Sequence, residues 1–111
     1  MNLHIENQKL RFRIKKEELE KLCLGEELKQ EIFLPKKNSL NINIKTTQKA
    51  DILFLLFSEN SLSLLVNKKA AQNLFNSLPK RDGLKIDQEI NGKQTLNLIL
   101  EVDIRTQKRK H

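Results

Sequence analysis

The sequence predicts a single α+β domain built from two copies of a strand–strand–helix–strand–strand unit. The chain of 111 residues is too short for two independent domains of ordinary size. Apolar residues alternate with polar ones in most of eight short segments, and they recur at helical spacing in two others. The order of these segments in the first half of the chain is repeated in the second half.

In the first half, four strands surround one short helix. The helix is predicted because Leu19, Leu22 and Cys23 fall on one face, and Gly25 follows where a helix C-cap belongs. The clearest half-buried strand has Leu, Ile and Ile alternating with Asn, Asn and Lys. In chain order, the expected elements are strands 3–5 and 10–14, helix 16–24, and strands 28–34 and 40–45.

In the second half the same order returns. Asn67 is a suitable N-cap for the second helix, and Pro79 ends it. The dipeptide Asn91-Gly92 favours a hairpin turn between the last two strands. The expected elements are strands 52–57 and 62–66, the helix that follows Asn67, and strands 84–90 and 96–104.

The two halves also resemble each other residue by residue. Residues 28–45 align with residues 84–101 at a constant offset of 56, and five of the 18 positions are identical. Residues 10–22 align with residues 62–74 at an offset of 52, and the difference between the offsets falls in the loop after the helix. The alignment keeps each apolar side chain on the same face of its strand, which a one-residue slip would destroy.

We therefore expect two ββαββ repeats that form one mainly antiparallel sheet of about eight strands. The two short helices would pack on one face of this sheet, which could curl toward a barrel. The expected boundaries are residues 1–104 for the domain, about 1–47 and 50–104 for the repeats, and 105–111 for a flexible basic tail.

The chain resembles an uncharacterised bacterial family of short proteins, the domain-of-unknown-function family 7009. The matching run is Leu3-His4-Ile5-Glu6-Asn7-Gln8-Lys9-Leu10-Arg11-Phe12-Arg13-Ile14, where the family has a short strand, a turn and an Arg-rich strand before a Leu-rich helix. Near the C-terminus, Glu101 and Asp103 match two acids of a family motif whose Lys, Phe and Cys are not matched. The resemblance implies the order of elements and no chemistry.

The composition excludes several classes of protein. One cysteine and two histidines provide neither an intrachain disulfide nor a zinc ligand set. The N-terminus does not read as a signal peptide, and the longest apolar run, residues 52–57, is far shorter than the ~20 residues of a membrane helix. The expected location is the cytoplasm, without membrane partners. No cofactor motif and no catalytic residue is identified, and an enzyme is the less favoured class.

An alternative function is the binding of an anion or a triphosphate. Polar strand faces offer Arg11, Arg13, Lys15 and Lys45 for phosphates, and Glu101 with Asp103 for a divalent metal. Acid, acid and base alternate along the last strand, which resembles the charged strands of triphosphate tunnel enzymes. A solvated sheet face accounts for the same charges.

The favoured function is a small protein-interaction module. One sheet face is expected to carry an apolar island among Lys, Asn and Glu, and such patches mark interfaces on soluble proteins. The simplest partner is a second copy of the chain. The expected interface residues are Ile52, Phe54, Leu56, Phe33, Leu65 and Ile99.

Nucleic acid is a weaker alternative partner. The formal net charge is +7, but four basic residues lie in the last seven, so the domain itself is only mildly basic. The five aromatic residues are all Phe, which leaves few side chains for base stacking. Only the tail is expected to bind nucleic acid, without sequence preference.

Overall fold

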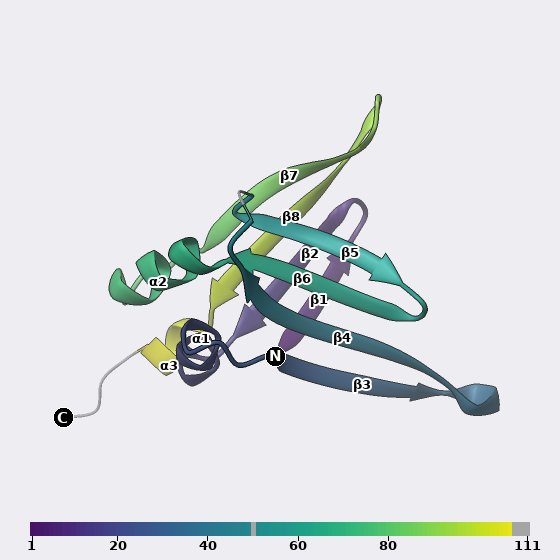
Figure 1. Ribbon diagram of the computed structural model, residues 1–111, viewed down its shortest axis with the longest axis horizontal. Helices are drawn as coiled ribbons and strands as arrows, with labels where there is room; N and C mark the ends of the chain where they lie inside the picture. The colour runs from purple at the N-terminus through teal and green to yellow at the C-terminus, as the bar shows by residue number, and fades with distance from the viewer. Residues whose placement is uncertain (50, 108–111) are drawn as a thin grey trace.

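The computed structural model describes residues 1–49 and 51–107 of the chain. Over this range, eight strands form two separate sheets, with helices gathered at one end (Figure 1). In chain order the elements are β1 (Asn2–Glu6), β2 (Lys9–Ile14), α1 (Lys16–Cys23), β3 (Leu28–Leu34), the 3-10 turn Pro35–Lys37, β4 (Asn38–Thr47), β5 (Leu53–Ser58), β6 (Ser61–Asn67), α2 (Lys68–Asn76), β7 (Leu84–Asn91), β8 (Gln94–Val102) and α3 (Ile104–Gln107).

The strands divide into sheet A, with the order β1-β2-β8-β7, and sheet B, with the order β3-β4-β6-β5. Each sheet consists of two antiparallel hairpins joined by a parallel central pair, β2 with β8 in sheet A and β4 with β6 in sheet B. Both sheets are therefore mixed. The expected eight strands are present, and four of the six strand pairs are antiparallel. The expectation of one sheet is wrong, because the strands form two mixed sheets, and over the described range neither sheet is closed or curled.

The division has a physical reason. Each half of the chain places its first hairpin in one sheet and its second hairpin in the other, and the intervening helix makes the crossing. Helices of eight and nine residues are too short to cover the apolar face of an eight-stranded sheet. Two amphipathic sheets instead cover each other, and the helices close one end of the layers (Figure 1).

The pairing registers of the two sheets coincide under the offsets found in the sequence. Leu10 pairs with Leu98 in sheet A, and its counterpart Leu62 pairs with Ile42 in sheet B. The antiparallel pairs β3–β4 and β7–β8 also correspond. Leu28 pairs with Ile44 in sheet B, and their counterparts Leu84 and Leu100 pair in sheet A. Exchanging the halves thus turns the strand order of one sheet into that of the other, as the internal repeat predicts.

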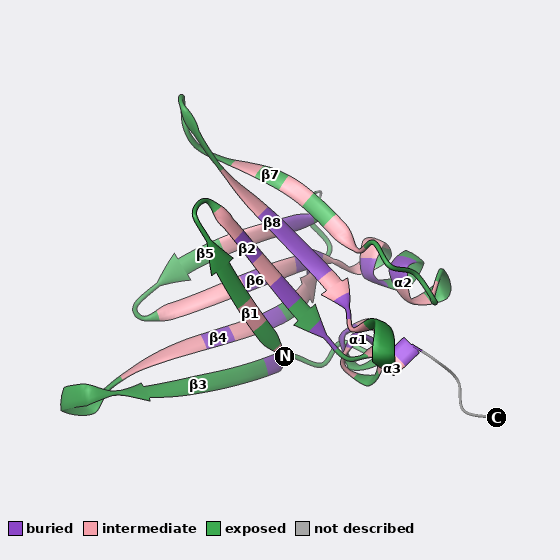
Figure 2. Ribbon diagram, turned by 180° about the vertical axis from the view of Figure 1, so that it is seen from behind, coloured by how far each residue is buried: buried purple, intermediate pink, exposed green. Residues whose placement is uncertain are grey.

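The core lies between the inner faces of the sheets and the helices. Phe12 and Leu100 of sheet A and Leu64 of sheet B are completely buried, together with Leu19 of α1. Figure 2 shows buried segments along β2 and β8, the central strands of sheet A. The side chains that face this space belong to the residues that strand alternation, with its period of two, places on the inner face of each sheet.

The N-terminus of α2 and the C-terminus of α1 are capped as the sequence predicts. The side-chain oxygen of Asn67 accepts a hydrogen bond from the backbone N–H of Ala70 at 2.9 Å, so Asn67 is the N-cap of α2. Gly25 follows α1 with φ at +90°, a conformation that costs other residues energy.

One lateral edge of the layers is fastened by a glutamine. The N–H of Leu55, on edge strand β5, donates to Oε1 of Gln88 at 2.8 Å, and Nε2 of Gln88 donates back to the carbonyl of Leu55 at 3.2 Å. Gln88 belongs to β7 of the other sheet, so its side chain ties the two sheets together. Ile32 holds the corresponding position on β3, and its side chain has no amide for such a clamp.

The C-terminal segment differs from the expectation. The last strand ends at Val102 rather than Ile104, and residues 104–107 form the short helix α3. Gln107 is buried, so the first part of the expected flexible tail is folded against the domain. The remainder of that tail, residues 108–111, lies outside the described residues.

Candidate functional site

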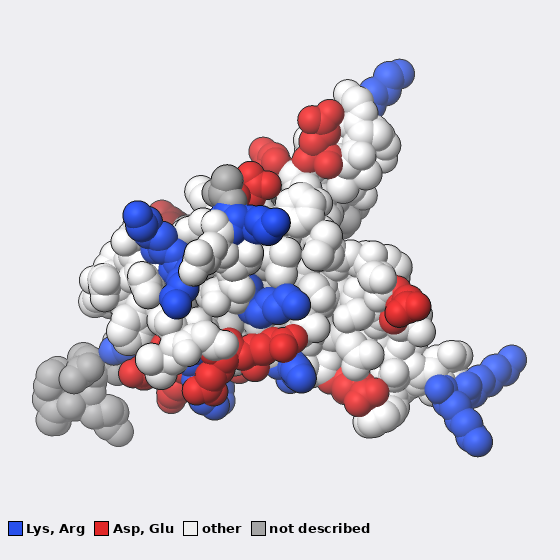
Figure 3. All heavy atoms as spheres, in the orientation of Figure 1, with Lys and Arg blue, Asp and Glu red and all other residues white. Residues whose placement is uncertain are grey.

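The outer face of sheet B is poor in charge. Its strands direct Ser and Asn side chains outward from β4 and β6, and Phe and Leu from β5. Among the described strand residues, the charged side chains assigned to this face by strand alternation are Lys29, Glu31 and Lys45. Figure 3 shows a broad uncharged area over β4, β5 and β6.

Four apolar residues form a continuous patch on this face, which we call the β5 patch. Ile52, Phe54 and Leu56 follow one another at period two, and Phe54 is paired with Leu65 of β6. Ile52 is 41% exposed and Leu56 is 47% exposed, whereas Phe54 and Leu65 are half-buried. These four are the expected interface residues that the structure brings together.

The other two expected interface residues lie elsewhere. Phe33 projects from β3 at the opposite edge of sheet B, where it is 79% exposed. Ile99 belongs to the outer face of sheet A and is only 6% exposed. The expected island of six residues is therefore wrong in extent, because it assumed a single sheet.

The corresponding face of sheet A is charged. At the offset of 52, Leu56 corresponds to His4 and Leu65 corresponds to Arg13, while Ser63 corresponds to Arg11. The two faces share one topology and register, so folding alone does not account for this difference. The two halves therefore carry different side chains at equivalent positions of their outer sheet faces.

On sheet A, two arginines of β2 flank one glutamate of β8. Arg13 is in register with Glu101, and its Nε donates to Oε2 of Glu101 at 2.8 Å. The Nε atom of Arg11 lies 3.8 Å from the other carboxylate oxygen, beyond hydrogen-bond distance. This Nε atom is buried and has no hydrogen-bond partner among the described residues.

A second ion pair stands directly after β8. Nη2 and Nε of Arg105 donate to the two carboxylate oxygens of Asp103, at 3.1 and 3.3 Å, and the backbone N–H of Arg105 adds a bond of 3.0 Å. The Arg105 side-chain hydrogen bond, then its backbone hydrogen bond, and the charges of Arg105 and Arg13 hold the pKa of Asp103 below its usual value. Asp103 therefore stays ionised, although it lies beyond the strand on which it was expected.

These groups surround one open hollow of about 410 Å³ on the outer side of sheet A. It brings together Arg11 and Arg13 of the expected anion-binding residues; Lys15 is not part of its lining, and Lys45 lies on sheet B. Sequence reasoning missed Arg81, whose loop returns to this place. The full lining is Arg11, Arg13, Arg81, Glu101, Val102, Asp103, Ile104 and Arg105.

The charged strand faces do not line a tunnel. Arg11, Arg13 and Glu101 lie on an outer face, and over the described range the sheets are not closed around them. Glu101 and Asp103 were candidate metal ligands, but both carboxylates face guanidinium groups. Within residues 1–49 and 51–107, no group of three or more His, Cys, Asp or Glu side chains is placed to hold a metal ion.

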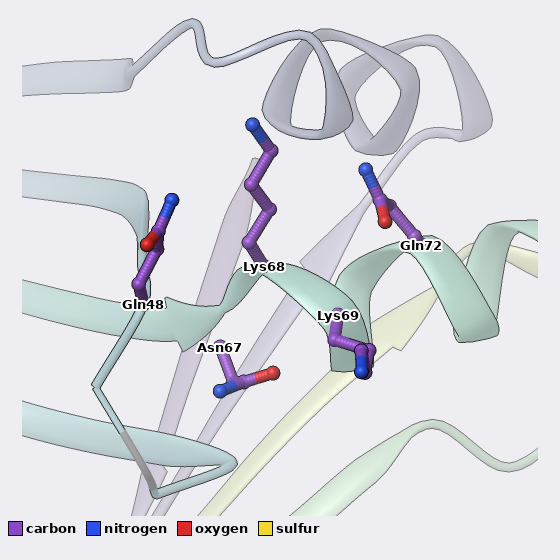
Figure 4. Close-up of a pocket in the computed structure, with 5 residues that line it drawn as sticks. All are labelled: Gln48, Asn67, Lys68, Lys69 and Gln72. Atoms are coloured by element: carbon purple, nitrogen blue, oxygen red, sulfur yellow. The ribbon is translucent and has the colours of Figure 1, made fainter.

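Another hollow, also about 410 Å³, lies at the start of α2 (Figure 4). Its lining includes Asn67, Lys68 and Gln72, and the Lys68 side chain points from α2 toward α1. Both polar groups of the Asn67 side chain are already used, since Oδ1 accepts from Ala70 and Nδ2 donates to the carbonyl of Lys49 at 2.7 Å. Helix capping and the bond to Lys49 account for the polar contacts of Asn67 at this hollow.

Cys23, on the apolar face of α1, packs against the core. Burial of the thiol, followed by the charge of Glu20, raises its pKa above the ordinary value. A thiol shifted in this direction is less ionised at neutral pH and therefore a poorer nucleophile.

Comparison with known families agrees with the resemblance noted from the sequence. The DUF7009 family, described as a family of unknown function, matches residues 1–110. The chain belongs to this family. No curated protein and no solved structure matches this DUF7009 chain significantly. Across the part of the chain that the structure describes, no helix has the length and apolar composition to cross a membrane.

Proposed function

We propose that the protein is an interaction module that self-associates through the outer face of sheet B, with the β5 patch at the centre of the contact. The observation that carries this proposal is the contrast between two faces of equal topology, one rich in charged side chains and one poor in charge with an apolar patch. Contiguous apolar surface on a small protein is typical of an interface. A two-fold dimer would place the same patch on both sides of the contact.

Net charge favours this face over the others. Two copies of a chain with a formal charge of +7 repel each other, and the repulsion is weakest where the approaching surfaces carry few charges. The outer face of sheet A carries charges of both signs, and contact through it would bury many charged groups. These include Arg11, Arg13, Lys85, Asp87, Glu89 and Glu101. The outer face of sheet B has only three charged strand residues, so contact through it buries fewer charges and removes Ile52 and Leu56 from water.

The Gln88 clamp supports contact through the face rather than through the sheet edge. An exposed apolar edge strand such as β5 usually offers its backbone groups to another strand. Here the N–H and C=O of Leu55, at the middle of β5, already bond to the Gln88 side chain. Strand addition at this edge would have to break both bonds, so face-to-face packing is favoured.

The matched positions of the two sheets provide the test. We expect Leu56→Asp to convert the protein from a dimer to a monomer, because two buried carboxylates would face each other across the two-fold contact. His4→Asp, the corresponding position on β1, introduces the same charge on the other sheet and should leave the dimer intact. Light scattering coupled to size exclusion would report about 26 kDa for wild type and His4→Asp, twice the 13.0 kDa of one chain, and half of that for Leu56→Asp.

Two results would contradict the proposal. One is a wild-type protein that stays monomeric at high concentration. The other is a dimer that Leu56→Asp leaves intact. Repeating the light-scattering measurement in high salt adds a further check. Salt screens the attraction between exposed charges but does not weaken an apolar contact, so the dimer should remain.

A further inference from the structure

Arginine is rare in this chain and concentrated in one place. The sequence has 21 basic residues, of which five are arginine. Four of these five, Arg11, Arg13, Arg81 and Arg105, line the hollow on sheet A. They come from β2, from the loop before β7 and from α3, so proximity in sequence explains only the first two. Lysine is far more abundant, yet no lysine among residues 1–49 and 51–107 lines this hollow.

The acids in the hollow balance only part of this charge. Glu101 and Asp103 are the two carboxylates of the lining, against four guanidinium groups. Glu101 bonds to Arg13, and Asp103 bonds to Arg105. Arg81 forms no ion pair with any residue that the structure describes. Two positive charges therefore remain without a matching carboxylate in the lining.

Many hydrogen-bond donors in the hollow are also unused. Each guanidinium has five N–H donors, yet within the described residues Arg13 uses one of them and Arg105 uses two. Arg11 uses none, and its Nε is both buried and unsatisfied. An anion that enters the hollow can accept hydrogen bonds from the unused guanidinium N–H groups that face it.

We propose that this hollow binds the phosphate group of a small phosphorylated molecule, or inorganic phosphate itself. Guanidinium forks match the oxygens of a phosphate group, and a phosphate monoester carries nearly two negative charges at neutral pH. Glu101 and Asp103 would hold Arg13 and Arg105 in place. Arg11, whose Nε lies 3.8 Å from Glu101, and Arg81 supply the charge that the two acids leave unbalanced. The lining has no aromatic residue to stack on a nucleobase, so recognition is limited to the phosphate. The site lies on sheet A and is independent of the proposed contact on sheet B.

Adjacent residues in one loop give a matched pair of variants. Lys80 and Arg81 are both exposed, and both lose one positive charge on replacement by glutamine, but only Arg81 lines the hollow. We expect Arg81→Gln to weaken phosphate binding about tenfold, the loss typical of one hydrogen bond to a charged group. Lys80→Gln should bind within about twofold of wild type, since its side chain lies outside the site.

The measurements are titration calorimetry and melting temperature with inorganic phosphate and with glycerol phosphate, each compared with potassium chloride at equal ionic strength. A rise in melting temperature with either phosphate compound, lost in Arg81→Gln and kept in Lys80→Gln, supports the site. A response to glycerol phosphate alone identifies the monoester as the ligand class. Equal behaviour of phosphate and chloride, or equal losses in the two variants, would overturn the proposal.

Discussion

Replacing Gly83 with alanine is expected to lower the free energy of unfolding by about 3 kcal/mol, at the upper end of ordinary overpacking in a protein interior. A Cβ atom at this position would lie 2.7 Å from Cα of Glu101 and 2.8 Å from the carbonyl carbon of Leu100, and closer still to the carbonyl oxygen. These are backbone atoms of the central strand β8, so no side-chain rotation relieves the overlap. The start of β7 would have to move away from β8, which weakens pairing in sheet A.

Gly92 provides the control for this prediction. Apart from Gly92 itself and its two neighbours in the chain, no described atom lies within 4 Å of the place where its Cβ would stand, and its φ is not in the left-handed region. We expect Gly92→Ala to change stability by less than about 0.5 kcal/mol, as exposed substitutions usually do. Urea denaturation of both variants would give the two values on one scale. Equal midpoints for Gly83→Ala and Gly92→Ala would contradict the close approach of β7 to β8.

The local elements of this fold were predictable because each depends on neighbours in sequence. Period two identified the strands, helical spacing identified α1 and α2, and Asn67 and Gly25 marked helix ends. The registers of the two halves were also predictable, since a slip would have turned the apolar side chains outward.

The partition into two sheets was not predictable in this way. Alternation assigns each residue a face of its strand, but it says nothing about which strands are neighbours. The pairing that decides the architecture joins Lys9 to Asn97 across most of the chain. Ile99 was consequently grouped with Phe54, although they belong to different sheets.

The residues that line the charged hollow on sheet A were also only partly predictable from the local sequence pattern. Arg11, Arg13 and Glu101 could be proposed from strand faces, whereas Arg81 lies in a loop whose path no periodicity describes. The one signal available in the sequence was the rarity of arginine beside lysine. That rarity becomes informative only once long-range pairing has brought the separate segments together.

Replacing Gln107 with leucine is expected to lower the free energy of unfolding by about 2–3 kcal/mol, because two partly buried backbone groups of Lys80 and the buried carbonyl of Val102 would lose their partners. Gln107 is 3% exposed, and its Nε2 donates to the carbonyls of Lys80 and Val102 at 2.8 and 2.9 Å. Its Oε1 accepts from the N–H of Lys80. Leucine has a similar size but offers none of these bonds. Gln72→Leu, at an exposed position of α2, is the control and should change stability by less than about 0.5 kcal/mol.

The same variant connects the C-terminal helix to the proposed phosphate site. Gln107 anchors Lys80, and the next residue, Arg81, lines the hollow. Loosening this loop should raise the mobility of Arg81, so Gln107→Leu is expected to bind glycerol phosphate more weakly than wild type, at a temperature where both are folded. Amide hydrogen exchange at Lys80 should accelerate in parallel. If Gln107→Leu is as stable as wild type and amide exchange at Lys80 is unchanged, then other contacts hold the loop and α3 does not position the site.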